Sequence, residues 1–173
     1  LERLPRLVVA QAEHANPLWR ATSGAGRKAA PGVKVAPVTA KSTLASAIQI
    51  GAPVSAERAL RALGALDGVV EQASEQELAD AAARADRAGL FTCPHTGVAL
   101  AALEKLARSG AVKRDERVVV ISTAHGLKFS DFKVGYHEEK LPGLRSPLRN
   151  LSVKLAPTLG AVQDAIAARF GRG

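Results

Sequence analysis

The sequence predicts an α/β fold in which a parallel sheet is flanked by helices. Short apolar segments of strand length at 7–10, 68–73 and 117–123 alternate with amphipathic stretches, and this alternation is typical of βαβ units. Residues 118–121 are continuously apolar, as in strands that a parallel sheet buries on both faces. A chain of 173 residues also fits one domain with a substantial core.

The N-terminal region combines a short strand with a long irregular segment. The strand at 7–10 leads into a helix-compatible stretch. Residues 22–37 are rich in Gly, Pro and Ala, hold three basic side chains and lack helical or strand periodicity, so we expect an exposed basic loop. Residues 42–51 then fit a short helix that Ser42 or Thr43 caps and a glycine ends.

Two capped helices frame the next predicted strand. One helix begins at Ser55, the strand covers 68–73, and the second helix covers 74–89. Ser74 and Glu77 stand at capping-box spacing, so each side chain can bind a free amide at the helix start. The apolar faces consist of Ala59, Leu60 and Leu63 in the first helix, and Leu78, Ala81, Ala82, Ala85 and Ala88 in the second.

The remaining helices follow the same pattern. On the polar face of the second capped helix we expect an ion pair between Asp80 and Arg84. Residues 95–110 predict another helix, and Pro157 starts a terminal helix at 157–170. The inward residues of the helix at 95–110 are Val98, Ala99, Ala102, Leu103 and Leu106.

The charge is strongly positive, formally +8 with a pI near 10.2. Residues 1–51 carry +5, residues 52–116 carry −2 and residues 117–173 carry +5. Two basic ends that converge in the fold would attract phosphate-bearing partners, whereas the alternative is an ordinary solvated surface. The candidates for RNA or phosphate contacts are Arg20, Arg27, Lys28, Lys34, Arg145, Arg149 and Lys154.

The composition restricts other classes of function. Cys93 is the only cysteine, so we expect a buried structural thiol, no internal disulfide and no metal site. No apolar run approaches the roughly 20 residues of a membrane helix, which predicts a soluble chain. The chain lacks methionine and begins with Leu1, so we expect a processed product or a piece of something longer.

A cluster of polar residues follows the strand predicted at 117–123. Ser122, Thr123, His125 and Lys128 lie at or just past its carboxyl end, which is where open α/β sheets bind their ligands. A glycine turn after a strand is usually only a turn, and that reading stays open beside the functional one.

Several motifs together resemble one enzyme family. They are LPRLVVAQAEHANPLWRA, STLASAIQIGAPVS, FTCPHTGVALAALEKL and RVVVISTAHGLKFSDFKVGYHE, which resemble threonine synthase, a fold-type II pyridoxal-phosphate enzyme. The match runs from Leu4 to Glu138 and more weakly through the terminal helix. The resemblance implies a partial fold-type II domain, with residues 1–173 as one C-terminal domain. It also implies a part in converting O-phosphohomoserine and water to threonine and phosphate.

The resemblance also implies cofactor-binding residues. Thr123 would face the pyridine nitrogen, and Ser122 and His125 share its turn. A hydroxyl there leaves the pyridine largely unprotonated, which suits elimination and replacement at the β and γ carbons. His95 and Thr96 match a segment near the cofactor at a helix start, where free amides can bind an anion; helix capping is the alternative role.

The departures from the family limit these expectations. Its members are far longer, and the lysine that carries the cofactor and the Gly/Asn-rich phosphate loop have no counterpart here. Lys128 belongs to a different motif and cannot replace that lysine. We therefore expect no catalytic residue in this chain, no activity by itself, and pyridoxal phosphate only if the missing N-terminal half is joined to it. Residues 139–156 form a basic, divergent connection to the terminal helix.

Two functions stay open. The chain is either part of a threonine synthase, with the N-terminal half as its partner, or a non-catalytic basic subunit of a large assembly such as an organellar ribosome. In the second case it binds RNA phosphates and neighbouring proteins. An organelle, either plastid or mitochondrion, is the favoured location, and bacterial cytoplasm is the alternative.

Overall fold

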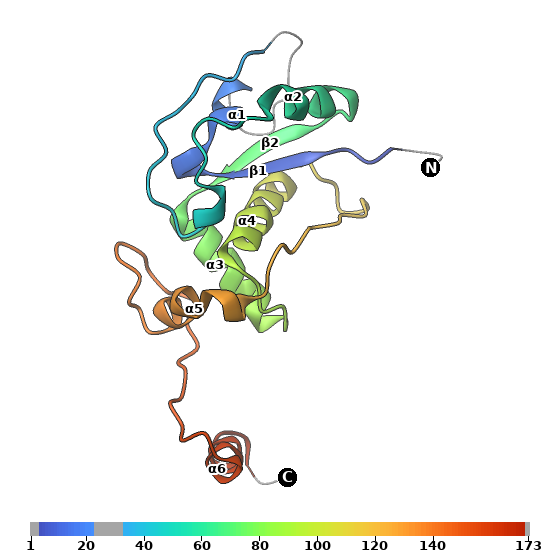
Figure 1. The fold of residues 1–173 in the computed structure, drawn as a ribbon. Coiled ribbons are helices and arrows are strands. Elements are labelled where there is room, and N and C mark those ends of the chain that lie inside the picture. The colour runs from blue at the N-terminus through green and yellow to red at the C-terminus, as the bar shows by residue number, and fades with distance from the viewer. Residues whose placement is uncertain (1–3, 23–32, 172–173) are drawn as a thin grey trace.

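The computed structural model describes residues 4–22 and 33–171, and it confirms an α/β fold with a small parallel sheet flanked by helices (Figure 1). The strands and helices are β1 Val8–Ala12, α1 Pro17–Ala21, α2 Ala56–Ala65, β2 Val69–Ala73, α3 Glu75–Arg87, α4 Pro94–Arg108, α5 Ser130–His137 and α6 Leu159–Phe170. Short 3₁₀ helices cover Glu13–Ala15, Ser46–Ile48 and Gly126–Phe129.

The two strands separate two apolar clusters. β1 and β2 pair in parallel, with Val8 opposite Val69 and Ala12 opposite Ala73. Figure 1 shows α1 and α2 on one side of the strands and α3 and α4 on the other. The smaller cluster centres on Leu18, Leu63 and Val70. The larger cluster consists mainly of alanines from α3 and α4, together with Leu78, Val98, Phe132 and Tyr136.

The sequence correctly predicts how α3 begins and ends. The Ser74 hydroxyl accepts a hydrogen bond from the Glu77 amide at 3.2 Å, and the Glu77 carboxylate accepts one from the Ser74 amide at 2.8 Å. Gly89 has a φ of +83°, which suits a glycine just past a helix end. Ala88, in contrast, is exposed instead of buried, because it lies beyond the last helical residue.

Asp80 and Arg84 form no direct ion pair in the structure, and beside the hydrogen bond to Glu104, Asp80 acts on Arg84 only as a nearby charge that helps to raise its pKa. Arg84 instead binds Glu104 of α4, with its Nε 2.8 Å from Oε1. Asp80 accepts hydrogen bonds from the Tyr136 hydroxyl at 2.6 Å and from Gln76 at 2.9 Å. These partners lie on other elements or one turn earlier, so tertiary contacts replace the local pair.

α3 and α4 approach each other closely. A Cβ at Gly97 would lie 2.5 Å from the Leu78 carbonyl oxygen, so only glycine fits at this crossing. Val98, Ala102 and Leu106 are buried as predicted. Two further predicted inward residues, Ala99 and Leu103, are only partly buried, while Ala101 is buried instead.

The helix predicted at 42–51 is reduced to the single 3₁₀ turn Ser46–Ile48. Backbone amides in this segment donate to side chains from distant elements instead of to helix partners. Glu75 accepts from the Leu44 amide at 2.7 Å, and His95 Nε2 accepts from the Ala47 amide at 3.0 Å. The Thr43 hydroxyl donates to Glu75 at 2.5 Å and accepts from the Ala45 amide at 3.2 Å, so it orders a turn and does not cap a helix.

The strand predicted at 117–123 does not form with any described segment. These residues have no regular secondary structure, and Val118, Val119 and Ile121 are 45%, 84% and 75% exposed instead of buried. In the described ranges the sheet consists of β1 and β2 alone, so the backbone of 117–123 has no strand beside it. An extended run of β-branched residues becomes a strand only when a neighbouring strand pairs with it.

The C-terminal region differs from the rest of the fold. α5, which the sequence analysis does not predict, packs Phe132 and Tyr136 into the larger cluster. α6 begins at Leu159 with Thr158 as its cap, two residues after the predicted Pro157, and buries none of its side chains. Figure 1 shows α6 standing away from the body at the end of an extended connection.

No helix in the described part of the chain has both the length and the hydrophobicity needed to cross a membrane.

Candidate functional site

The start of α4 and the turn after residue 121 are held together by backbone contacts. The Cys93 amide donates to the Ala124 carbonyl at 3.3 Å, and the Gly126 amide donates to the Phe91 carbonyl at 2.9 Å. Thr92 and His125 form an isolated antiparallel bridge. Two sequence motifs about 30 residues apart therefore form one local structure.

A thiol and three hydroxyls gather at this junction. The Cys93 sulfur lies 3.2 Å from the Thr96 hydroxyl and 3.6 Å from the Thr123 hydroxyl. The Thr96 hydroxyl lies 3.3 Å from that of Ser122, and the Thr96 amide donates to the Cys93 sulfur at 3.4 Å. We call Cys93, Thr96, Ser122 and Thr123 the hydroxyl–thiol cluster. It brings together three of the five predicted cofactor-binding residues.

Cys93 has an unusual electrostatic environment. Its side chain is fully buried, and burial by itself raises the pKa of a thiol, but hydrogen bonds from Thr96, Thr123 and His95 outweigh it and lower the pKa to about 6. The sequence predicts only a structural role for this thiol. Its position as the residue just before a helix start is the local signal that indicates a perturbed pKa.

The other two predicted cofactor-binding residues, His95 and His125, make contacts of their own. His95 accepts from the Ala47 amide at 3.0 Å, and its ring lies 5.1 Å from the Phe129 ring. His125 Nδ1 accepts from the Leu127 amide at 3.2 Å, which caps the following 3₁₀ helix. Both imidazoles therefore use a ring nitrogen to order the backbone around the cluster.

A buried ion pair fastens α5 beneath the turn. Lys133 is 4% exposed, and its Nζ lies 2.7 Å from Asp86 Oδ1 of α3 and 4.9 Å from the centre of the Phe91 ring. Burial lowers the pKa of Lys133, while Asp86 opposes that shift. Sequence reasoning missed this pair. A lysine between two aromatic residues spaced four apart, Phe132 and Tyr136, is the only local signal for it.

The outer side of the cluster is open. Ser122, Thr123 and His125 are exposed. Two hollows elsewhere, both lined in part by His14, include no member of the cluster. In residues 4–22 and 33–171, no three histidine, cysteine or acidic side chains gather to hold a metal ion. The site is thus an open polar face and not an enclosed pocket.

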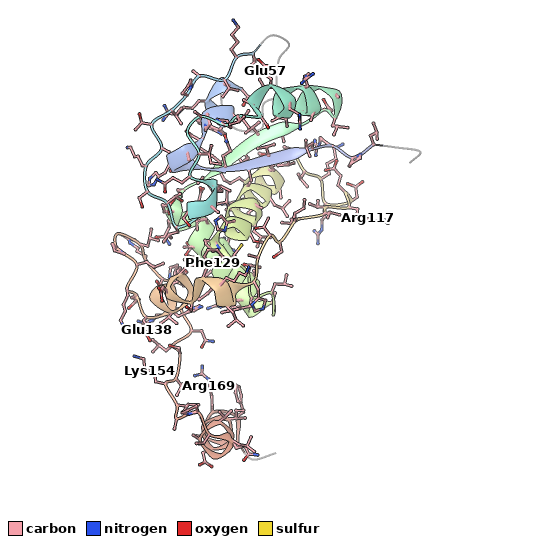
Figure 2. The ribbon with its side chains drawn as sticks, in the orientation of Figure 1. Glu57, Arg117, Phe129, Glu138, Lys154 and Arg169 are labelled. Atoms are coloured by element: carbon pink, nitrogen blue, oxygen red, sulfur yellow. The ribbon has the colours of Figure 1, made fainter. Side chains whose placement is uncertain are left out.

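The basic candidates do not form one patch in the part of the chain that the structure describes. Arg20 binds Asn16 at 3.0 Å and Arg149 binds Glu139 at 2.6 Å. Figure 2 shows Lys154 at the opposite end of the molecule from Glu57 of α2, and α1, which carries Arg20, lies beside α2 in Figure 1. Lys34, Arg145 and Lys154 are exposed, and Arg27 and Lys28 lie outside the described residues.

Comparison with known proteins identifies the family of the chain. A family model described as "Pyridoxal-phosphate dependent enzyme" matches residues 1–124. The chain is 47% identical to Threonine synthase 2, chloroplastic, of Arabidopsis thaliana over 96% of its length and 31% of that protein. It is 35% identical to the threonine synthase of Methanocaldococcus jannaschii over 82% of its length and 34% of that protein. It is 34% identical to the threonine synthase of Mycobacterium leprae, over 76% and 33% respectively.

The chain spans about a third of the length of these relatives. The family model covers β1, β2, α3 and α4 together with all four residues of the hydroxyl–thiol cluster. The chain therefore belongs to the pyridoxal-phosphate-dependent enzymes and resembles their threonine synthases.

Proposed function

We propose that this chain is the C-terminal portion of a threonine synthase-like enzyme, which converts O-phosphohomoserine and water to threonine and phosphate. Its part in that reaction is to present Thr123 to the pyridine nitrogen of pyridoxal phosphate. The observation that carries the proposal is the hydroxyl–thiol cluster. In it the exposed Thr123 contacts the buried Cys93, with 3.6 Å between the hydroxyl oxygen and the sulfur.

The residues at the cluster fit the pyridine end of the cofactor. A hydroxyl can either donate to or accept from a ring nitrogen. In the described chain the Ser122 and Thr123 hydroxyls contact the Thr96 hydroxyl and the Cys93 sulfur, respectively, and neither of these groups is a carboxylate. A carboxylate would hold a proton on the nitrogen, whereas a neutral hydroxyl does not require one. When bound, pyridoxal phosphate supplies an electron sink for charge that develops on the substrate carbons.

The remaining functions of the site belong to the part of the enzyme outside this chain. Lys133 is buried and paired with Asp86, so it is not free to carry a cofactor, and Lys128 lies in a different motif from that of the cofactor lysine. We therefore infer that the cofactor lysine and the phosphate loop lie in the N-terminal portion. The chain alone is then inactive.

Two exposed apolar surfaces support a larger enzyme. The first is the segment with Val118, Val119 and Ile121, and the second is α6, in which Leu159 and Phe170 are 74% and 78% exposed. Surfaces of this kind mark contacts with other protein. In the proposed enzyme the N-terminal portion covers them.

The test joins the chain to the N-terminal two-thirds of the Arabidopsis relative. We expect the 173-residue chain alone to show neither the absorbance of bound pyridoxal phosphate nor threonine formation, and the joined protein to show both. Thr123→Val in the joined protein should lower kcat by about 10²-fold and change the cofactor absorbance. Thr39→Val, the same substitution at another exposed threonine, is the matched control.

Two results would overturn the proposal. One is a joined protein that binds the cofactor and forms threonine equally well after Thr123→Val. The other is a chain that is purified from its source with RNA, in a salt-dependent manner, and without any threonine synthase N-terminal portion.

We also propose a plastid location. The support is the word "chloroplastic" in the name of the Arabidopsis relative. Fractionation of the source cells, with immunodetection of the chain, tests the location, and a signal confined to the cytosol contradicts it.

A further inference from the structure

Thr123 has one hydroxyl proton and two candidate acceptors for it. One acceptor is the Cys93 sulfur, 3.6 Å away inside the protein. In the proposed function, the other acceptor is the pyridine nitrogen at the open face. A single O–H cannot donate in both directions at once, so the sulfur and the ring nitrogen compete for it.

The form of Cys93 decides the competition. A thiolate is only an acceptor, and around this sulfur the Thr96 amide at 3.4 Å, the Thr96 hydroxyl at 3.2 Å and the Thr123 hydroxyl at 3.6 Å are arranged to donate to it. Thr123 then offers only lone pairs to the open face. A neutral thiol can donate its own proton to Thr123, which frees the threonine proton to point outward.

We propose that Cys93 is a positioning residue that sets whether Thr123 acts as a donor or an acceptor toward the pyridine nitrogen. This inference rests on the proposed function and deepens it. Cys93 itself lies behind Thr123 and is fully buried, so it acts through the threonine and not on the substrate.

The surroundings keep both forms of the thiol accessible. The thiol pKa of about 6 lies near neutral pH. From its own helix, His95 lowers that pKa, and from α5 the buried Lys133 interacts with the thiolate while it is paired with Asp86 of α3. A modest change in the contacts of Thr123 can therefore shift the balance between thiol and thiolate.

The direction of the linkage follows from this competition. A ligand whose ring nitrogen accepts the Thr123 proton removes a donor from the thiolate, so it raises the pKa of Cys93. By reciprocity, raising the pH through that pKa weakens this contact and favours a ring nitrogen that carries its own proton.

The first test needs no cofactor. Since the chain has one cysteine, the ¹³Cβ resonance of labelled Cys93 reports one titration without ambiguity. We expect Thr123→Val to raise its midpoint by about one pH unit, because one donor to the thiolate is lost. Thr123→Ser should restore the wild-type midpoint, and Thr39→Val should leave it unchanged. An unchanged midpoint in Thr123→Val overturns the inference.

The second test uses the joined protein. Wild type should show a cofactor absorbance that changes between about pH 5 and pH 8 with the titration of Cys93, and Cys93→Ser, which stays neutral over that range, should abolish this pH dependence while the cofactor remains bound. If the dependence persists in Cys93→Ser, the inference is wrong and the proposed function stands. If wild type does not bind the cofactor at all, the proposed function fails, while the titration of Cys93 still reports on its contact with Thr123.

Discussion

The body of the molecule and its C-terminal third contain similar apolar residues in opposite environments. Val70 of β2 and Leu78 of α3 are completely buried, whereas Val119 is 84% exposed and Leu159 of α6 is 74% exposed. The body buries most of its apolar residues in two clusters within the described chain, although single residues such as Val54 stay exposed. In the C-terminal third, α5 packs against the larger cluster, whereas the segment 118–121 and α6 leave apolar side chains exposed.

The link between the two regions can be broken at one ion pair. Asp86→Ala should destabilise the protein by about 3–5 kcal/mol, because it leaves the Lys133 ammonium buried without its partner. Urea unfolding measures the effect. Asp86→Ala combined with Lys133→Met should recover most of the loss, and a loss under 1 kcal/mol for Asp86→Ala would show that α5 is not anchored by this pair.

A matched pair of leucines tests the contrast in burial directly. Leu78→Ala should cost about 2–5 kcal/mol, since it leaves a cavity between α3 and α4, whereas Leu159→Ala should stay within about 0.5 kcal/mol. Thermal and urea unfolding of both variants provide the comparison. Equal losses would mean that α6 packs against the body in solution.

The pH dependence of stability tests the hydroxyl–thiol cluster, which joins the start of α4 to the turn of the C-terminal third. Folding lowers the pKa of Cys93 from 9.0 to about 6. The thiolate form therefore stabilises the folded state fully above pH 9, and this stabilisation is lost as the pH falls through 6. Wild type should therefore gain on the order of 2–4 kcal/mol between those limits relative to Cys93→Ser. Urea midpoints at pH 5.5, 7 and 9 measure this, and parallel curves for the two proteins would contradict it.

The smallest effect concerns the start of α3. Ser74→Ala removes one half of the capping box and should cost about 1 kcal/mol. Thr158→Ala removes the equivalent cap of the exposed α6, and global unfolding should not detect that loss. Amide hydrogen exchange in α6 should detect it, and a similar global loss in both variants would contradict the separation of α6 from the body.

Local sequence signals predicted the parts of the fold that depend on local physics. The capping box at Ser74 and Glu77, the glycine end of α3 and the parallel sheet all follow from spacing and composition. The resemblance to threonine synthase predicts a cofactor contact for Thr123, and this stays a prediction; the structure places Thr123 in one cluster with Cys93, Thr96 and Ser122.

The remaining features depend on contacts that are distant in sequence. The helix expected at 42–51 is replaced because Glu75 and His95 take its amides. The strand expected at 117–123 needs a neighbour that the described chain does not provide. The pKa of Cys93 depends on burial, which raises it, and on hydrogen bonds that lower it, first from Thr96, which is local, and then from Thr123, 30 residues later; no local pattern contains that last contribution.

Gly97 has a consequence for how this protein can evolve. Any other residue there would press a carbon against the Leu78 carbonyl at 2.5 Å, so the first turn of α4 cannot move away from α3 by small mutational steps. Cys93 and Thr96 lie at the start of α4, so their positions are fixed with it. Mutations can change the exposed turn that carries Thr123 one at a time, whereas moving Cys93 and Thr96 requires α3 and α4 to be repacked together.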